Sequence, residues 1–242
     1  MRPTLRIDLT LSSANLQSTV ILDSDHEEIR ALARTFADPT LTVQRRLQHV
    51  HHHLVQVLNP VYSLNEWQPA SVTLLNRRGS CSQRMACLEA IARALGIPTR
   101  VHVLYVARNF WYPRFGRWRI FMPKRILLLW PQFQIGEQWV DFDELHAPVT
   151  RLVEHSPNGF TNDGESLFEA VLHTPVDFFA KTAALSCATP SCNLSRFVVG
   201  DEGFFDLRDE AIQRFGTLNQ TLRGRLFEIL LGERPSTSRA QC

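Results

Sequence analysis

Apolar side chains recur every three to four residues in the first part of the chain, which is the period of an amphipathic helix. Residues 24–37 begin with Ser24 or Asp25, either of which can cap a helix, and acidic residues fill the first turn. Residues 40–59 place five apolar side chains on one face: Val43, Leu47, Val50, Leu54 and Leu58. We therefore predict a helix in each of these two stretches.

A third helix is predicted directly after Cys81, and Gly96 and Pro98 end it. Ser80 or Cys81 stands at its start. Its apolar stripe consists of Met85, Leu88, Ile91, Ala92 and Leu95. Polar residues occupy the other positions: Gln83, Arg84, Glu89 and Arg93. This pattern predicts a helix that is packed against a core on one side only.

Later stretches have the composition and spacing of strands. Residues 100–106, 125–135 and 138–145 are rich in branched and aromatic side chains, and Gly136 with Glu137 predicts a hairpin turn between the last two. Residues 1–20 alternate apolar and polar side chains, which predicts a strand pair. Helices followed by antiparallel strands indicate an α+β fold.

Length and composition limit the class of protein and its domain organisation. With 242 residues, 44% hydrophobic and 21% charged, the chain is typical of a globular protein with a sizeable core. We expect a core over residues 1–155, a helical extension over residues 156–242 that packs on it, and a disordered tail. No signal peptide or membrane span is expected, and a net charge of +2 does not indicate a polyanionic partner.

Cysteine usage favours a reducing, cytoplasmic setting, because the five cysteines are an odd number and mostly far apart. The pair Cys187 and Cys192 lacks a second half for a zinc site, so no metal is expected, although a local disulfide is an alternative. The histidines at 49, 51, 52 and 53 fan around their helix and lack an accompanying carboxylate. We interpret them as a solvated face, with a metal site as the alternative.

Cys81 is the residue whose local chemistry matters most. Free backbone N–H groups and the helix dipole stabilise a thiolate at a helix start, which is how reactive cysteines acquire a low pKa. Cys87 has no such position. The alternative is that Cys81 is a small buried residue at a tight turn, and the local sequence does not decide between these interpretations.

Four motifs carry a resemblance to a known family: Gly79-x-Cys81, residues 95–101 (LGIPTRV), residues 130–133 (WPQF) and residues 136–143 (GEQWVDFD). Over about residues 40–145 the chain resembles the transglutaminase-like superfamily, a relative of the papain-like cysteine proteases. The resemblance implies a papain-like core in which Cys81 is the nucleophile and Asp143 the orienting carboxylate. The family histidine should stand two positions before Trp130, where this chain has Leu128.

Leucine cannot transfer a proton, so three alternatives stay open. His102, on the strand that follows the Cys81 helix, or His146 supplies the base; we choose His102 as the catalytic residue. Alternatively, a thiolate stabilised by Arg84 or Arg100 reacts with a thioester without a base, since a thioester has a good leaving group. In the third alternative, the protein is a catalytically silent binding module.

Aromatic and basic side chains alternate over residues 110–125. Such an insert can stack on flat ligands and hold phosphates, or it is a packed loop with solvated arginines. We favour an acidic carrier protein or its phosphopantetheine arm as the partner over nucleic acid. The candidate substrate-binding residues are Trp111, Arg114, Trp130, Gln132 and Arg100.

These features lead to one hypothesis and one alternative. The hypothesis is acyl transfer through a Cys81 thioester, without a cofactor. By analogy of fold, it includes amide formation or cyclisation of a carrier-bound acyl or peptidyl chain in natural-product biosynthesis. The alternative is a transglutaminase-like binding module that uses the same cleft without catalysis.

Overall fold

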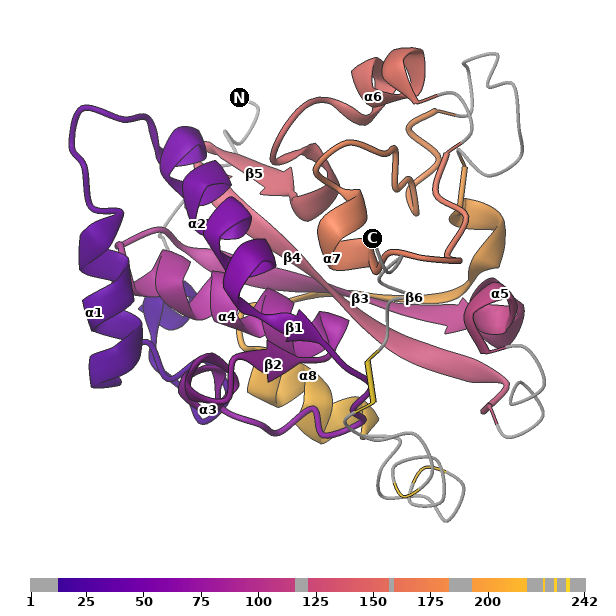
Figure 1. Cartoon of the computed structure of the whole chain (residues 1–242), viewed down its shortest axis with the longest axis horizontal. Helices are drawn as coiled ribbons and strands as arrows, with labels where there is room; N and C mark the ends of the chain where they lie inside the picture. Colours follow the sequence, from indigo (N-terminus) through magenta and orange to yellow (C-terminus); the bar gives the residue numbers. More distant parts are fainter. Residues whose placement is uncertain are drawn as a thin grey trace, which may run out of the picture.

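The central element is a four-stranded antiparallel sheet in the strand order β5-β4-β3-β6 (Figure 1). The computed structural model describes residues 13–115, 122–156, 159–182 and 193–216, together with residues 224, 229, 234 and 235. The strands of this sheet are β3 (Thr99–Ala107), β4 (Arg125–Ile135), β5 (Gln138–Asp141) and β6 (Val198–Phe205). A separate parallel pair consists of β1 (Asn59–Pro60) and β2 (Arg78–Gly79). The predicted α+β class is confirmed.

The predicted hairpin is also confirmed. β4 and β5 are joined at Gly136, whose φ of 64° suits glycine because it lies in the left-handed region. In the β3–β4 ladder, Leu104 is opposite Leu128 and His102 is opposite Trp130. Because opposite residues of an antiparallel pair point to the same face, this register decides which side chains can meet.

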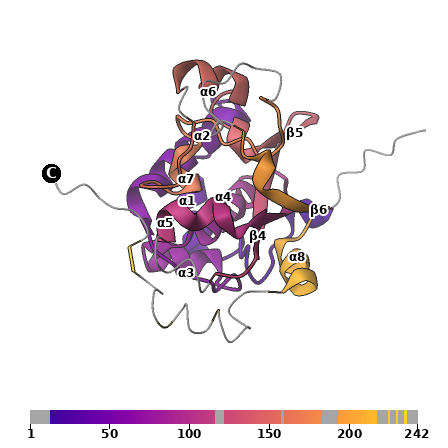
Figure 2. The same cartoon turned by 90° about the vertical axis from the view of Figure 1, so that its right-hand side faces the viewer.

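Helices surround the sheet (Figures 1 and 2). Their bounds are α1 (Glu27–Thr35), α2 (Val43–Val57), α3 (Ala70–Leu75), α4 (Cys81–Ala94), α5 (Tyr112–Phe115), α6 (Val149–His155), α7 (Leu167–Ala170) and α8 (Arg208–Phe215). Short 3-10 turns occupy Ser13–Leu16, Arg108–Trp111, Phe142–Glu144 and Ser195–Phe197. No helix in the described part of the chain is both long and apolar enough to cross a membrane.

The three predicted helices are present as α1, α2 and α4, with two corrections. His26, rather than Ser24 or Asp25, caps α1, because its side chain accepts a hydrogen bond from the Glu28 N–H at 3.3 Å. The second correction concerns α4, which is packed against α1, α2, α3 and β4 and is buried on nearly all sides. The strand pair predicted for residues 1–20 lies mostly outside the described residues.

Buried partners explain why polar side chains are tolerated around α4. Arg84 pairs with Glu169, and Glu89 pairs with Arg208. Arg93 donates to the backbone carbonyls of Ala14, Gln17, Thr99 and Asp206. Since all of these partners except Thr99 are far from α4 in sequence, periodicity alone predicted an exposed polar face.

The C-terminal part of the chain is not purely helical. Residues 198–205 form β6, which pairs with β3 and so belongs to the main sheet. Exposed and inward side chains alternate along part of it, and Phe205 is buried at its end. After β6, the chain is helical only from Arg208 onward, in α8, up to the end of the described stretch at residue 216.

Candidate functional site

Cys81 is the first residue of α4, and the turn before it is tightly constrained. Ser80 caps the helix by accepting from the Gln83 N–H, while the Gln83 side chain accepts from the Ser80 N–H at 2.8 Å. Gly79 packs so closely that a Cβ added there would lie 2.7 Å from Thr73 Cγ2. The Gly-x-Cys motif therefore fixes the place of the thiol.

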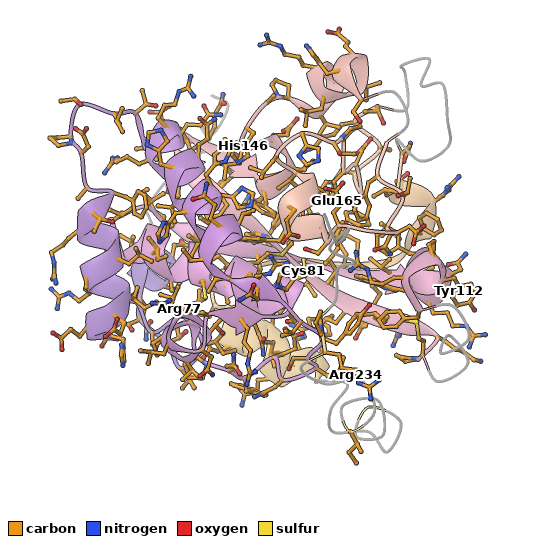
Figure 3. All side chains as sticks on the ribbon, viewed as in Figure 1. Arg77, Cys81, Tyr112, His146, Glu165 and Arg234 are labelled. Atoms are coloured by element: carbon orange, nitrogen blue, oxygen red, sulfur yellow. The ribbon has the colours of Figure 1, made fainter. Side chains whose placement is uncertain are left out.

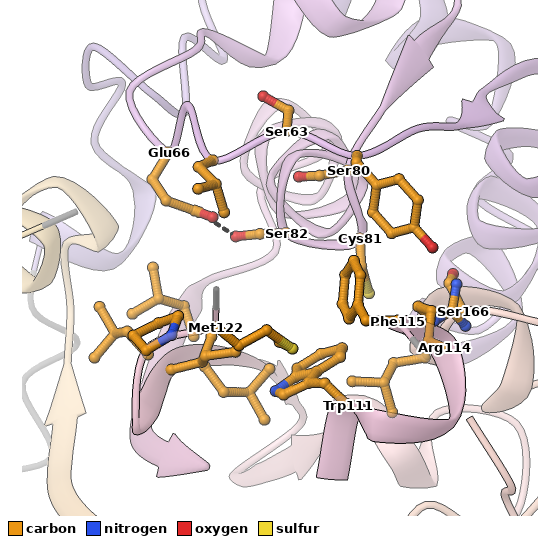
Figure 4. A pocket seen from close by; sticks show the side chains of 18 of the residues that line it. Ser63, Glu66, Ser80, Cys81, Ser82, Trp111, Arg114, Phe115, Met122 and Ser166 are labelled. Carbon is orange, nitrogen blue, oxygen red and sulfur yellow. Dashed lines mark hydrogen bonds between the residues drawn. The ribbon is translucent and has the colours of Figure 1, made fainter. Parts of the chain in front are cut away.

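The Cys81 side chain lies on the wall of a cavity of about 600 Å³ (Figures 3 and 4). The wall comes from the segment after β1, the start of α4, α5 with the preceding turn, strand β4 and the segment before α7. Most of it is apolar: Val61, Leu64, Met85, Trp111, Phe115, Met122, Ile126, Leu127, Leu128, Leu129 and Leu167. A cavity of this size and lining is typical of a small-molecule site.

Polar groups lie on both sides of Cys81 in this cavity. Ser82 donates a hydrogen bond to Glu66 on one side, and Arg114 and Ser166 lie on the other (Figure 4). Arg114 donates to the Asn162 side chain at 3.0 Å and to the Glu165 carbonyl. The thiol therefore lies between an acidic and a basic part of an otherwise apolar cavity.

Burial determines the protonation of Cys81. It raises the pKa of the thiol to about 11, and the charges of Arg84 and Arg114 together with the Phe168 N–H reduce this rise only in part. The expectation that the helix start gives Cys81 a low pKa is therefore wrong. At neutral pH Cys81 is a neutral thiol.

Arg84 connects the cysteine helix to the opposite wall. Its guanidinium donates to both Glu169 and Ser166, with a distance of 2.6 Å from Nη2 to Ser166 Oγ. It also stacks on the Phe168 ring, 4.8 Å from the ring centre. Arg84 is fully buried, and Glu169, which neutralises its charge, is on α7. This ion pair therefore holds α7 against α4.

The family model of the transglutaminase-like superfamily matches residues 30–144, which include the whole of α4 and the β3–β4–β5 hairpins. Residues 30–144 are therefore similar to the core of the transglutaminase-like superfamily. Cys81 lies within the matched residues, and its role as the nucleophile stays a prediction from the resemblance.

A solved structure named "Putative Cysteine Protease from Cytophaga hutchinsonii" is similar to part of the chain, with 19% sequence identity and a TM-score of 0.44. The match covers 57% of this chain and 44% of that one, so this chain spans less than half of that protein's length. No curated protein matches the sequence.

Leu128, where the resemblance places the family histidine, lines the same cavity as Cys81. Its neighbours Ile126, Leu127 and Leu129 line the cavity too. No histidine is present among the described residues that line the cavity. The wall that would carry a base in a transglutaminase-like enzyme is therefore apolar here.

The side chain of His102 does not lie beside Cys81. Its Nε2 is 2.8 Å from Asp201 Oδ1, and its ring stacks on Phe179 and packs on Phe204, none of which lines the cavity. The β3–β4 register places His102 on the same face as Trp130 and Leu128, but its ring packs on Phe179 and Phe204, away from the cavity. A direct role of His102 as the base is not supported by this placement.

Asp143 is fully buried, and its partners are Lys181 and Trp130 rather than a histidine or an arginine. Trp130 Nε1 donates to it at 3.1 Å and Lys181 Nζ at 3.0 Å. Lys181 also pairs with Asp141 and Glu144. Burial raises the pKa of Asp143 to about 7 despite the charge of Lys181. Asp143 does not line the cavity, so its role as an orienting carboxylate stays a prediction.

The predicted substrate-binding residues divide into two groups. Trp111 and Arg114 line the cavity. Trp130 is buried in the core, Gln132 accepts from Arg100 at 2.7 Å, and Arg100 stacks between Trp139 and Phe204. These last three lie outside the cavity, because β4 presents Trp130 and Gln132, and β3 presents Arg100, to other parts of the chain.

Sequence reasoning missed several cavity residues: Tyr62, Glu66, Ser82, Asn162 and Ser166. Ser82 follows Cys81 directly, so its position was a usable signal. The others come from segments without periodicity, 15 or more residues from Cys81 in sequence. Only the folded chain brings them to the thiol.

We expect iodoacetamide to modify Cys81 much faster than Cys87 at pH 8–9. Cys81 is partly exposed, whereas Cys87 has no exposed surface and burial raises its pKa further. The Cys81 rate should increase roughly tenfold per pH unit until the pH approaches its pKa, because only the thiolate reacts. Peptide mass spectrometry over time measures both rates. Equal rates would contradict the accessibility of Cys81.

Proposed function

We propose that the protein binds an apolar ligand in the cavity beside Cys81 and has lost transglutaminase-like catalysis. The observation that carries this proposal is Leu128, which stands where the resemblance places the family histidine and lines the cavity as part of its apolar wall. A leucine cannot accept the thiol proton, but it stabilises an apolar ligand through buried area, about 25 cal/mol for each Å².

The state of Cys81 supports the same proposal. A thiol whose pKa is raised to about 11 by burial is neutral at physiological pH, and a neutral cysteine behaves as a small apolar residue. Cys81 then contributes contact area and shape to the cavity rather than a nucleophile.

Binding is tested with a fluorescent apolar probe and long-chain acyl amides as competitors. We expect Leu128→Asn to weaken probe binding about tenfold, because an amide side chain loses hydrogen bonds when an apolar ligand covers it. Leu75→Asn is the matched control, since Leu75 is on α3 and 59% exposed, outside the cavity. Equal affinity of both variants and the wild type would contradict the proposal.

A second function, acyl transfer through Cys81, is favoured by the place of the thiol at the start of α4 with Arg84, Arg114 and the Phe168 N–H around it. In this proposal the Cys81 thiolate attacks the carbonyl carbon of a thioester, the donor's C–S bond breaks and the donor thiolate leaves with the electron pair. An acceptor amine or hydroxyl then attacks the Cys81 thioester, which releases the thiol.

The acyl or peptidyl donor of this second function would be presented by an acidic carrier protein in natural-product biosynthesis. The basic side chains Arg114 and Lys124 on the cavity wall support such a partner. The free thiols of Cys81 and Cys87 support a cytoplasmic setting.

Intact-mass spectrometry separates the two functions. Wild type and Cys81→Ser are incubated with a panel of acyl thioesters of different chain lengths. We expect reversible binding to both proteins and no covalent adduct, because the thiol lacks a base. A mass increase of one acyl group in the wild type alone would establish acyl transfer instead.

A further inference from the structure

Helices α1 and α2 both pack on α4, and a small hollow lies between them at the end of α4 (Figure 1). Its volume is about 240 Å³, and none of the residues that line it also lines the cavity beside Cys81. Three arginines surround it: Arg30, Arg34 and Arg46. The rest of its wall is apolar and consists of Ala33, Ala37, Ala94 and Leu95. No acidic side chain is among the described residues that line the hollow.

The helical repeat brings two of these arginines together. Arg30 and Arg34 are four residues apart on α1, so their side chains lie on the same side of the helix. Both side chains are exposed. Ala33, which stands between them in sequence, is buried and too small to fill the space beside them. α1 therefore presents two guanidinium groups along one side of the hollow.

Arg46 reaches the hollow from α2, whose sides differ in their surroundings. His51 of the same helix is fully buried, with Nε2 2.7 Å from the Phe168 carbonyl oxygen, so the interpretation of the α2 histidines as a solvated face is wrong for His51. Arg46 lies instead toward α1 and α4 and is half-buried in the first turn of α2. The positive end of the helix dipole disfavours a cation in that turn. The dipole of α2 therefore does not explain why an arginine stands there.

The charges of the three arginines are not neutralised by the surrounding chain. Among the residues that the structure describes, none of the three forms an ion pair or a side-chain hydrogen bond. Asp38, in the segment between α1 and α2, accepts instead from the N–H and the hydroxyl of Thr40, at 2.8 and 2.7 Å. The last carbonyls of α4 accept from the backbone N–H groups of residues 95–97.

The guanidinium of Arg46 is also incompletely hydrogen-bonded. Its Nε is buried, and within the described residues it has no acceptor. Buried N–H groups in proteins are nearly always paired, so an unpaired one calls for a partner. A ligand that brings several acceptor oxygens into the hollow would supply both the hydrogen bonds and the negative charge.

We propose that this hollow binds a phosphate group, either as the free ion or as part of a small phosphate monoester. A phosphate monoester carries almost two negative charges near neutral pH and has three strong acceptor oxygens, so one group can bond to three guanidinium groups at once. A carboxylate has one charge and two oxygens, which suit a single arginine. The alanines of the wall leave room for a small organic group beside the phosphate. This site is separate from the cavity, and the proposal does not rest on the function proposed above.

The test is isothermal titration calorimetry at constant ionic strength and pH 8, with inorganic phosphate, phenyl phosphate and acetate as the probes. We expect Arg46→Gln to weaken the binding of both phosphate compounds about tenfold, the effect of losing one charge-assisted hydrogen bond. Arg45→Gln is the matched control, because it removes the same charge from the adjacent position. Arg45 is exposed, bonds to Gln48 and does not line the hollow. This control should change the affinity less than about twofold, since salt screens distant charges.

A second variant, Arg34→Gln, guards against a folding defect, because Arg34 is exposed on α1. It should weaken phosphate binding about fivefold, and it replaces Arg46→Gln if that variant does not fold. Equal losses in Arg45→Gln and Arg46→Gln would show a general effect of charge and overturn the proposal. Equal affinity for acetate and phosphate, or no binding of either phosphate compound, would overturn it too. Tighter binding of phenyl phosphate than of inorganic phosphate identifies a monoester as the ligand, and the reverse identifies the free ion.

Discussion

Replacing Arg208 with methionine lowers the free energy of unfolding by about 3–5 kcal/mol, the usual cost of removing one partner of a buried ion pair. Arg208 and Glu89 have 1% and 0% of their side-chain surfaces exposed, and Arg208 Nη2 lies 2.5 Å from Glu89 Oε1. The other carboxylate oxygen, Oε2, has no hydrogen-bond partner among the described residues. Arg208→Met therefore leaves the buried Glu89 carboxylate without its ion-pair partner, and the charge of Arg93 compensates for this only in part. Urea denaturation at pH 7 measures the difference.

The control for this variant is the double substitution Glu89→Met with Arg208→Met, which removes both charges. Most of the lost stability should return, because a buried ion pair is replaced by apolar groups of similar size. Arg208 also donates to Ser82 Oγ at 3.1 Å and to the Leu129 carbonyl at 3.3 Å, so recovery is incomplete. A loss below about 1 kcal/mol in the single variant would show that the pair contributes no more than a surface ion pair.

Leu128→His should accelerate alkylation of Cys81 at pH 7 about 100-fold. An imidazole on the cavity wall can take the thiol proton, and the imidazolium then stabilises the thiolate, which lowers the thiol pKa by about two units. Below the pKa, each unit raises the thiolate fraction tenfold. The initial rate with iodoacetamide, resolved by peptide, measures this change.

Leu128→Gln is the matched control, because glutamine is polar and similar in size but does not titrate. It should leave the rate within about threefold of the wild type, since it provides no positive charge. Even in Leu128→His, Asp143 stays bonded to Lys181 and Trp130, so the new histidine lacks an orienting carboxylate. An equal rate in the two variants would mean that Leu128 does not face the thiol.

The elements with strong local signals could be predicted from the sequence. α2, α4 and the β4–β5 hairpin each have a regular apolar spacing or a turn residue that requires one conformation, such as Gly136. The resemblance to the family then led us to expect a nucleophile at Cys81 and placed Leu128 where the family has a histidine, and both stay predictions. These features depend on neighbours in sequence, so they could be predicted from the sequence alone.

The protonation and partners of the site could not be predicted. The helix begins at Cys81 as expected. The desolvation that raises the pKa of the Cys81 thiol, however, depends on how distant segments such as residues 168–169 pack around the thiol. The burial of His51 depends on Phe168, 117 residues later. Contacts between residues so far apart carry no local sequence signal, so neither periodicity nor spacing reveals them.

The origin of β6 affects how the protein can fold during synthesis. β3 is complete by Ala107, whereas its partner strand begins at Val198, and the paired residues Val101 and Phe205 are about 100 residues apart. When β3, β4 and β5 have left the ribosome, one edge of β3 is therefore still unpaired. Pairings between strands far apart in sequence also form slowly. During this interval the nascent chain exposes an open strand edge, which makes it a substrate for chaperones and prone to self-association.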